Sequence, residues 1–273
     1  MNVILCADDF GYSKAISNGI IRLCELKKIN ATSVLIESPN IDLYIERLKK
    51  LQLENKIQIG LHLNLTDNFN HLNLKLKNKF NLFYLILNFA LRFNEVSIIY
   101  QNIINQLSLF VDKFGFIPDF IDGHEHVHIF PFIRKYLFFA LNEFLEKYNN
   151  HQINTGTLNH DNIQKRPWIR QVNPSYHADS IIKCIVLNIL NFHFSKGCKA
   201  NNFKTNDSFD GVYSFKFYAF KILIKEWLYS NKSNDNKNKV IMLHPSEKFE
   251  FNIKHSDTRV KEFKYLLENI HKN

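Results

Sequence analysis

The chain has 273 residues, of which 45% are hydrophobic and 22% charged, so it can bury a large core and is not a disordered protein. The net charge of +9 comes from lysines spread along the sequence, and without a basic block we expect no nucleic-acid partner. The four cysteines form no CxxC pair and no apolar run is long enough to span a bilayer, so we expect a cytoplasmic protein with reduced thiols and no stable membrane insertion.

Apolar runs of strand length alternate with segments of helical periodicity in the first half of the chain. We expect strands at 3–7, 32–37 and 57–65, with helices at 14–27 and 41–51 between them. Two more helices are expected at 82–93 and 96–114.

The second half continues the alternation less regularly. We expect a strand at 120–124, helices at 132–147, 181–194 and 215–229, a strand at 240–243 and a closing helix at 257–270. Residues 151–205 are otherwise hard to assign, and 230–239 reads as a solvated loop. The alternation predicts parallel strands with helical crossovers in a single domain spanning 1–273.

Polar side chains able to bind a metal follow the expected strands. They are Asp8 and Asp9 after the first strand, His62 and Asn64 on the third, Asp122 and His124 on the fourth, and His244 after the last. In parallel sheets and barrels the carboxyl ends of the strands form the face where ligands bind. We therefore expect one functional site at that edge.

The adjacent carboxylates of Asp8 and Asp9 are costly to bury without partners. At the exit of a strand both can approach one site, where one carboxylate binds a metal and the other acts as general base. The alternative is that one of them caps the following helix, although Ser13 is an equally good cap.

Two histidine motifs follow. In GLHLNLT, His62, Asn64 and Thr66 share one face of a strand, although a lone strand histidine is more often a core residue. In DGHEHVH, the spacing of two puts Asp122, His124, His126 and His128 on one strand face, with a polar loop as the alternative.

His244, fixed by the following proline, is placed to act as a general acid.

The motifs ADDFGYS, GLHLNLT, DGHEHVHIFP and LHP, in this order, resemble those of the carbohydrate deacetylases of the YdjC family. The resemblance implies a distorted (β/α) TIM-like barrel and one divalent metal ion, Mg or Zn. It also implies that Asp9, His62 and His124 hold the metal, with Asp8 as general base and His244 as general acid. Glu125 stands where the family often has histidine, and we expect it to point away from the ligands.

The function that follows is metal-dependent removal of an acetyl group from an N-acetylated sugar or oligosaccharide. Whether His126 or His128 supports His124 or replaces it as a metal ligand is left open. We expect the residues that contact the substrate specifically to lie in 151–205. Alternatives are a deacylase of a lipid-linked N-acyl sugar, a basic nucleic-acid-binding protein or metallonuclease, and a non-catalytic metal-binding protein. A homodimer is left open.

Overall fold

The computed structural model describes residues 2–54, 57–67, 96–154, 166–176, 178–229 and 238–270. In these residues a seven-stranded parallel sheet has the order β5-β4-β3-β2-β1-β7-β6. The strands are β1 (Asn2–Phe10), β2 (Ala31–Val34), β3 (Gln58–Leu63), β4 (Phe120–Gly123), β5 (Trp168–Ile169), β6 (Ser208–Asp210) and β7 (Asn238–Leu243).

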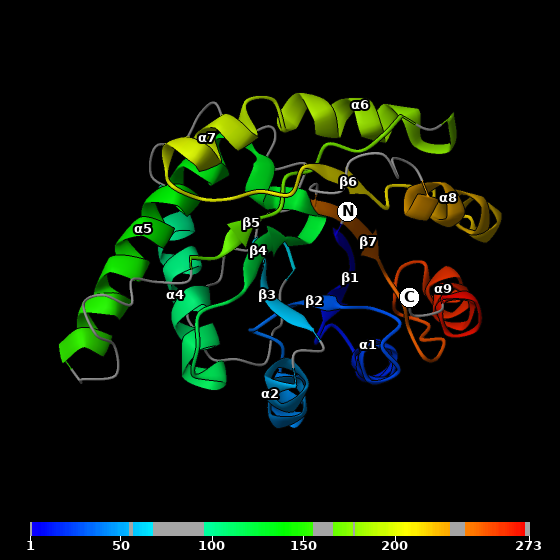
Figure 1. The fold of residues 1–273 in the computed structure, drawn as a ribbon, viewed down its shortest axis with the longest axis horizontal. Helices are drawn as coiled ribbons and strands as arrows, with labels where there is room; N and C mark the ends of the chain where they lie inside the picture. Colours follow the sequence, from blue (N-terminus) through cyan, green and yellow to red (C-terminus); the bar gives the residue numbers. More distant parts are fainter. Residues whose placement is uncertain are drawn as a thin grey trace.

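The two edges of this sheet approach each other. Ile169 of β5 forms a bridge to Thr205, and Pro174 forms a second bridge to Phe209 of β6. The sheet therefore curls into the expected distorted barrel, whose seam is held by isolated bridges rather than by a continuous ladder. Helices surround the strands on the outside (Figure 1).

The helices follow the predicted alternation closely. They are α1 (Lys14–Glu25), α2 (Ile45–Leu53), α4 (Val96–Phe114), α5 (Pro131–Asn154), α6 (Ile181–Leu190), α7 (Phe194–Ala200), α8 (Phe217–Tyr229) and α9 (Ser256–Asn269). Short 3-10 turns are η1 (Ile41–Leu43), η3 (His124–Ile129) and η4 (Ala178–Ser180). The predicted helix at 82–93 and most of the predicted loop at 230–239 lie outside the described residues.

Several predicted bounds were wrong. The helix expected at 41–51 is divided into η1 and α2. The one expected at 181–194 ends earlier, at Leu190, and a separate helix, α7, begins at Phe194. Strands β5 and β6 were not predicted, because two or three residues are too short to show a period.

Local chemistry just after β1 and within β3 shapes the approach to the site. The Ser13 hydroxyl accepts a hydrogen bond from the Ile16 N–H at 3.2 Å, so Ser13 caps α1 and both aspartates are left for other roles. In β3, a Cβ at Gly60 would lie 2.4 Å from the Phe120 ring, so this position admits only glycine without repacking.

Across the described residues, none of the helices combines the length and the apolarity that a bilayer crossing requires.

Candidate active site

Asp8 and Asp9 reach the same cavity although they are neighbours on one strand. The pairing of β1 with β2 shifts register between Ala7 and Phe10, and Asp9 has a left-handed φ of 65°. This irregularity turns the second carboxylate back toward the first. Both are buried and line a cavity of about 530 Å³ at the carboxyl ends of the strands.

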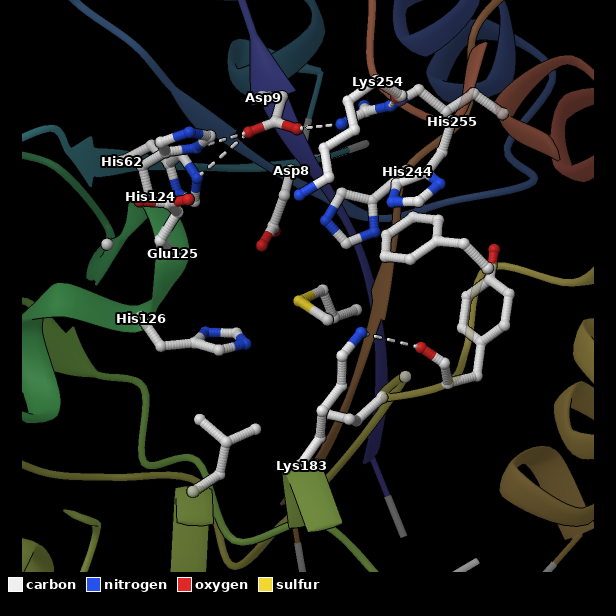
Figure 2. Close-up of a pocket in the computed structure, with 18 of the residues that line it drawn as sticks. Asp8, Asp9, His62, His124, Glu125, His126, Lys183, His244, Lys254 and His255 are labelled. Carbon is white, nitrogen blue, oxygen red and sulfur yellow. Dashed lines mark hydrogen bonds and ion pairs between the residues drawn. The ribbon is translucent and has the colours of Figure 1, made fainter. Parts of the chain in front are cut away.

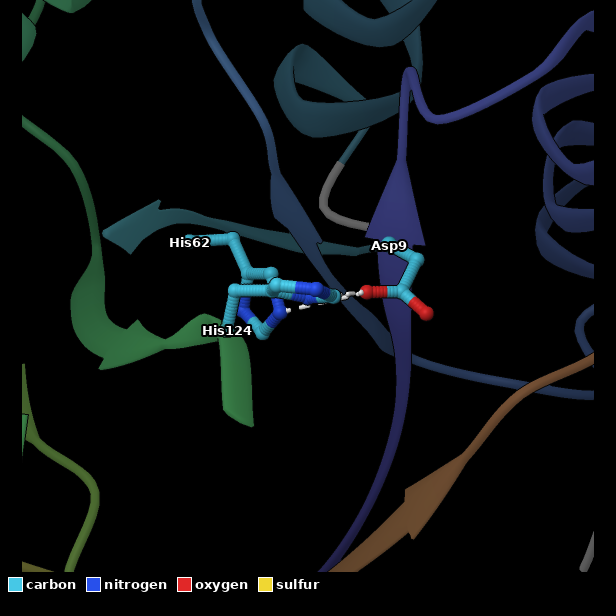
Figure 3. A group of neighbouring side chains, drawn as sticks. All are labelled: Asp9, His62 and His124. Carbon is cyan, nitrogen blue, oxygen red and sulfur yellow. Dashed lines mark hydrogen bonds and ion pairs between the residues drawn. The ribbon is translucent and has the colours of Figure 1, made fainter. Parts of the chain in front are cut away.

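Asp9, His62 and His124 come together as the family resemblance implied (Figure 3). Asp9 Oδ1 lies 3.4 Å from His62 Nε2 and 2.9 Å from His124 Nδ1. One ligand atom from each residue falls within 4.8 Å of the others. Two imidazoles and one carboxylate converging in this way can coordinate a divalent cation and leave positions open to water and substrate.

Carboxylates outside the cluster orient its histidines. His62 Nδ1 lies 2.7 Å from Asp122 Oδ1, which leaves Nε2 directed toward Asp9. His124 Nε2 lies 3.0 Å from Asp67 Oδ2. Carboxylates of this kind hold metal-binding imidazoles in one orientation and raise their basicity.

The charges of the cluster favour a bound cation. Burial opposes protonation of His62, but Asp122 outweighs it and raises the pKa of His62 to about 10. Burial also opposes protonation of His124, yet Asp9 and Asp67 raise its pKa to about 9. Burial would raise the pKa of Asp9, but the Arg259 and His124 charges hold it well below its usual range. The surroundings thus stabilise positive charge at the place where the three ligand atoms meet.

Asp8 has a different partner, which the sequence did not reveal. Arg170, at the exit of β5, is fully buried and binds Asp8 through two hydrogen bonds of 2.7 and 2.9 Å. Its Nη2 also lies 2.6 Å from Asp122 Oδ2. Cys6, Asp8 and Asp122 are residue types that can bind a metal ion, and their ligand atoms lie close together. The guanidinium of Arg170, however, occupies the space among them. Burial would raise the pKa of Asp8, but Arg170 and His62 keep it well below its usual range.

Helix α9 supplies two further residues that sequence reasoning missed. Arg259 Nη2 donates to Asp9 Oδ2 at 2.6 Å. Glu262 is fully buried; it accepts the backbone N–H of His244 at 2.7 Å and the hydroxyl of Tyr213. Burial raises the pKa of Glu262 to about 7. The i, i+3 spacing of Arg259 and Glu262 indicates that the two side chains lie on one face of a helix. Nothing in the sequence, however, identifies the residues that they bind.

His244 lines the same cavity as Asp8 and Asp9 (Figure 2). Its ring lies 5.3 Å from that of Phe215, and no described residue forms a hydrogen bond with its Nδ1. Burial and the charge of Arg259 lower the pKa of His244 to about 4. The imidazole is therefore neutral at pH 7 in this structure, so a role as general acid requires His244 to gain a proton first.

The predicted extended face of DGHEHVH was wrong. Strand β4 ends at Gly123 and η3 follows, with left-handed φ values at Glu125 and His126. The imidazoles therefore diverge. His126 lines another part of the cavity and stands edge-on to Phe209, whereas His128 Nε2 lies 2.8 Å from the Arg170 carbonyl oxygen.

Other residues of the motifs also take positions that the sequence did not predict. Glu125 is exposed and lines the cavity, contrary to the expectation that it points away. Asn64 Oδ1 accepts the backbone N–H groups of Thr66 and Asp67, so it shapes the turn that carries Asp67 to His124. From the region expected to contact substrate, Ile182, Lys183, Val186 and Leu187 line the cavity.

Comparisons with known proteins agree with this architecture. The profile of the YdjC-like protein family matches residues 2–272. A solved structure from Enterococcus faecalis, provisionally described as that of a cellobiose-phosphate cleavage protein, superimposes with a TM-score of 0.62. It shares 18% sequence identity and the match covers 98% of this chain and 91% of the enterococcal chain, which at this identity supports the fold alone. By the extent of the profile match, this chain belongs to the YdjC-like protein family.

Proposed function

We propose that this protein is a metal-dependent hydrolase that removes the acetyl group from an N-acetylated sugar. The observation that carries the proposal is the convergence of Asp9, His62 and His124 in one cavity with Asp8 and His244. Membership of a carbohydrate-related family supports a sugar as substrate.

The donor set fits a divalent ion. Imidazole nitrogen with carboxylate oxygen suits Zn, Mn, Fe or Ni, whereas Mg prefers more oxygen ligands. A divalent ion held by Asp9, His62 and His124 supplies Lewis acidity toward the amide carbonyl and lowers the pKa of water. The Asp122 contact to His62 Nδ1 supports this assignment, because it leaves the other ring nitrogen free to bind.

Asp8 is the proposed general base. Its two hydrogen bonds to Arg170 fix the carboxylate in one orientation at the cavity wall. The same ion pair keeps Asp8 ionised, so it is ready to accept a proton from an attacking water molecule. Arg170 is a positioning residue in this scheme, since it does not line the cavity.

His244 is the proposed general acid. An amine is a poor leaving group, so the departing nitrogen must receive a proton. Because the resting imidazole is neutral, His244 has to acquire this proton during the reaction. Asp8, which lies near enough to stabilise the imidazolium charge, is the residue that can pass on the proton taken from water.

The remaining walls of the cavity suit a sugar. The volume of about 530 Å³ is within the range of small-ligand pockets, and Tyr12, Tyr213 and Phe215 offer aromatic surface to the apolar face of a sugar ring. Tyr12 stands beside His124, with ring centroids 5.9 Å apart. An acetamide directed at the metal ligands would thus lie against aromatic side chains.

Release of acetate tests the proposal directly. Purified protein should liberate acetate from short N-acetylglucosamine oligomers or a related N-acetyl sugar, lose this activity in chelator and regain it with added Zn or Mg. The variant Asp8→Asn is the matched control, since it preserves the shape of the side chain and removes the proposed base. Absence of acetate from all N-acetyl sugars, with metal bound, would overturn the proposal.

One observation favours a second substrate class. Ile182, Val186 and Leu187 of α6 give the cavity an apolar wall, which suits a sugar attached to a lipid. The two substrate classes can be distinguished by comparing the rate of acetate release from a free N-acetyl sugar with the rate from its alkyl glycoside. A preference of at least about tenfold for the alkyl glycoside would favour the lipid-linked substrate.

A further inference from the structure

We propose that α6, with neighbouring parts of α7 and α8, is a docking surface for an anionic lipid bilayer. The proposal does not depend on the reaction catalysed in the cavity. It rests on the exposure of α6, on the charges around it and on its position at the cavity.

Helix α6 presents aliphatic side chains to solvent. Ile181, Ile182, Ile185, Val186 and Ile189 are between 43% and 75% exposed. Its opposite side carries the fully buried Cys184, so the helix is apolar on both sides. A helix of this kind needs a partner for its outer face, and contiguous exposed apolar surface marks interaction sites.

The apolar surface extends beyond α6. Phe192, just after the helix, is 66% exposed, and Ile222 and Tyr218 on the outer side of α8 are 59% and 63% exposed. Figure 1 shows α7 and α6 along the top of the view on the outside of the barrel, with α8 lower, on the right-hand side. Aliphatic and aromatic side chains together on a helical surface are typical of insertion into the interface of a bilayer.

The excess of positive charge on α6, α7 and α8 favours an anionic partner. The three helices contain five lysines (Lys183, Lys196, Lys199, Lys221 and Lys225) against the single acidic residue Glu226. In the described structure, Lys196, Lys199, Lys221 and Lys225 form no ion pair with a carboxylate. Each lysine near an anionic membrane contributes favourably to binding.

A second copy of the chain fits this surface less well. In a two-fold contact the same patch faces itself, so lysines of one copy would approach lysines of the other. Lysine is also depleted in the centre of protein interfaces. Anionic headgroups have the complementary charge, and the acyl region accommodates the isoleucines.

The surface is continuous with the cavity. Ile182 and Val186 are exposed and also line the cavity, whereas Ile181, Ile185 and Ile189 lie outside it. A bilayer in contact with the outer face of α6 would therefore lie beside the cavity opening. Substrate attached to that bilayer would reach the active site without leaving the membrane surface.

Flotation with lipid vesicles tests the inference with the complete protein. Vesicles of phosphatidylcholine containing about 30% phosphatidylglycerol should carry the protein with them at 50 mM salt, and vesicles of phosphatidylcholine alone should carry much less. The double variant Ile185→Asp/Ile189→Asp should weaken partitioning at least tenfold, because acidic groups replace the inserted side chains. The variant Lys196→Gln/Lys199→Gln should weaken binding to anionic vesicles and reduce its dependence on salt.

A matched control comes from the opposite side of the barrel. Leu43 and Leu53 are 66% and 81% exposed, on η1 and at the end of α2, so Leu43→Asp/Leu53→Asp makes the same chemical change away from α6. This control should bind vesicles like the unmodified protein. Circular dichroism should confirm that all variants remain folded, as expected for changes at exposed positions.

Three results would overturn the inference. The first is failure of the unmodified protein to bind anionic vesicles at low salt, and the second is equal binding by the Ile185→Asp/Ile189→Asp variant. The third is a dimer, detected by light scattering, that this variant dissociates, since a second copy would then cover α6.

Discussion

Replacing Arg170 by methionine should destabilise the protein strongly, because it leaves two buried carboxylates without their cation. The guanidinium lies 2.7 and 2.9 Å from the oxygens of Asp8 and 2.6 Å from Asp122, and all three residues are at most 1% exposed. Removing one partner of a buried ion pair costs about 3–5 kcal/mol. Since domains are stable by about 5–15 kcal/mol, Arg170→Met should lose a large part of the free energy of unfolding.

Equilibrium denaturation in urea, with chelator present, measures this loss. Arg134→Met is the matched control: among the described residues, Arg134 hydrogen-bonds only the carbonyl oxygens of Leu190 and Phe192, so its loss should cost no more than about 1.5 kcal/mol. Adding Asp8→Asn to Arg170→Met should recover at least about 1 kcal/mol, because one unpaired charge is removed.

The pH dependence gives a second readout. Without Arg170, burial raises the pKa of Asp8 above its value in the unfolded chain, so stability is lost as pH rises through the folded pKa. The deficit of Arg170→Met should therefore be larger at pH 8 than at pH 5. A deficit below about 1 kcal/mol at pH 8, similar to that of Arg134→Met, would refute the assigned role of Arg170.

Three further predictions concern the metal, the base and a buried carboxyl group. His62→Ala and His124→Ala should each lose most bound metal in elemental analysis, and full occupancy in His124→Ala would exclude it as a ligand. Asp8→Asn should keep its metal and its fold but lose roughly two to four orders of magnitude in turnover, whereas a near-normal rate would rule out the general base. The pKa of Glu262 is raised from 4.5 to about 7, so its contribution to stability is present below pH 4.5 and lost by pH 7. The stability difference between Glu262→Gln and the unmodified protein should therefore change by roughly 3 kcal/mol across this window in thermal or urea unfolding, and a constant difference would contradict the shift.

The part of the site that was predictable from the sequence lies at the ends of well-formed strands. Asp9 and His62 lie near the carboxyl ends of strands, and His244 directly follows one. The apolar runs of these strands are long enough to identify in the sequence, and the convergence of the three residues follows from parallel pairing. The path of the histidines after Gly123 was not predictable, because the left-handed turn at Glu125 and His126 depends on tertiary packing rather than on local sequence.

The supporting residues were not predictable for a different reason. Arg170 follows a two-residue strand in a segment with no regular period, and Arg259 and Glu262 lie on a helix whose polar residues look solvated. Arg170 binds Asp8, 162 residues earlier in the chain, and Arg259 binds Asp9, 250 residues earlier, whereas Glu262 accepts the backbone N–H of His244. Single-sequence patterns carry no information about such pairings.

The bridges that close the barrel limit which segments can be exchanged between related proteins. Ile169 and Pro174 form the two bridges that join the sheet edges, and Arg170 stands between them. An insertion or deletion within 168–174 would shift the register of the seam and move Arg170 away from Asp8 at the same time. Residues 178–200, which supply the α6 wall of the cavity, lie outside the bridged stretch. Grafts intended to change substrate range should therefore begin after Pro174 and leave the preceding residues intact.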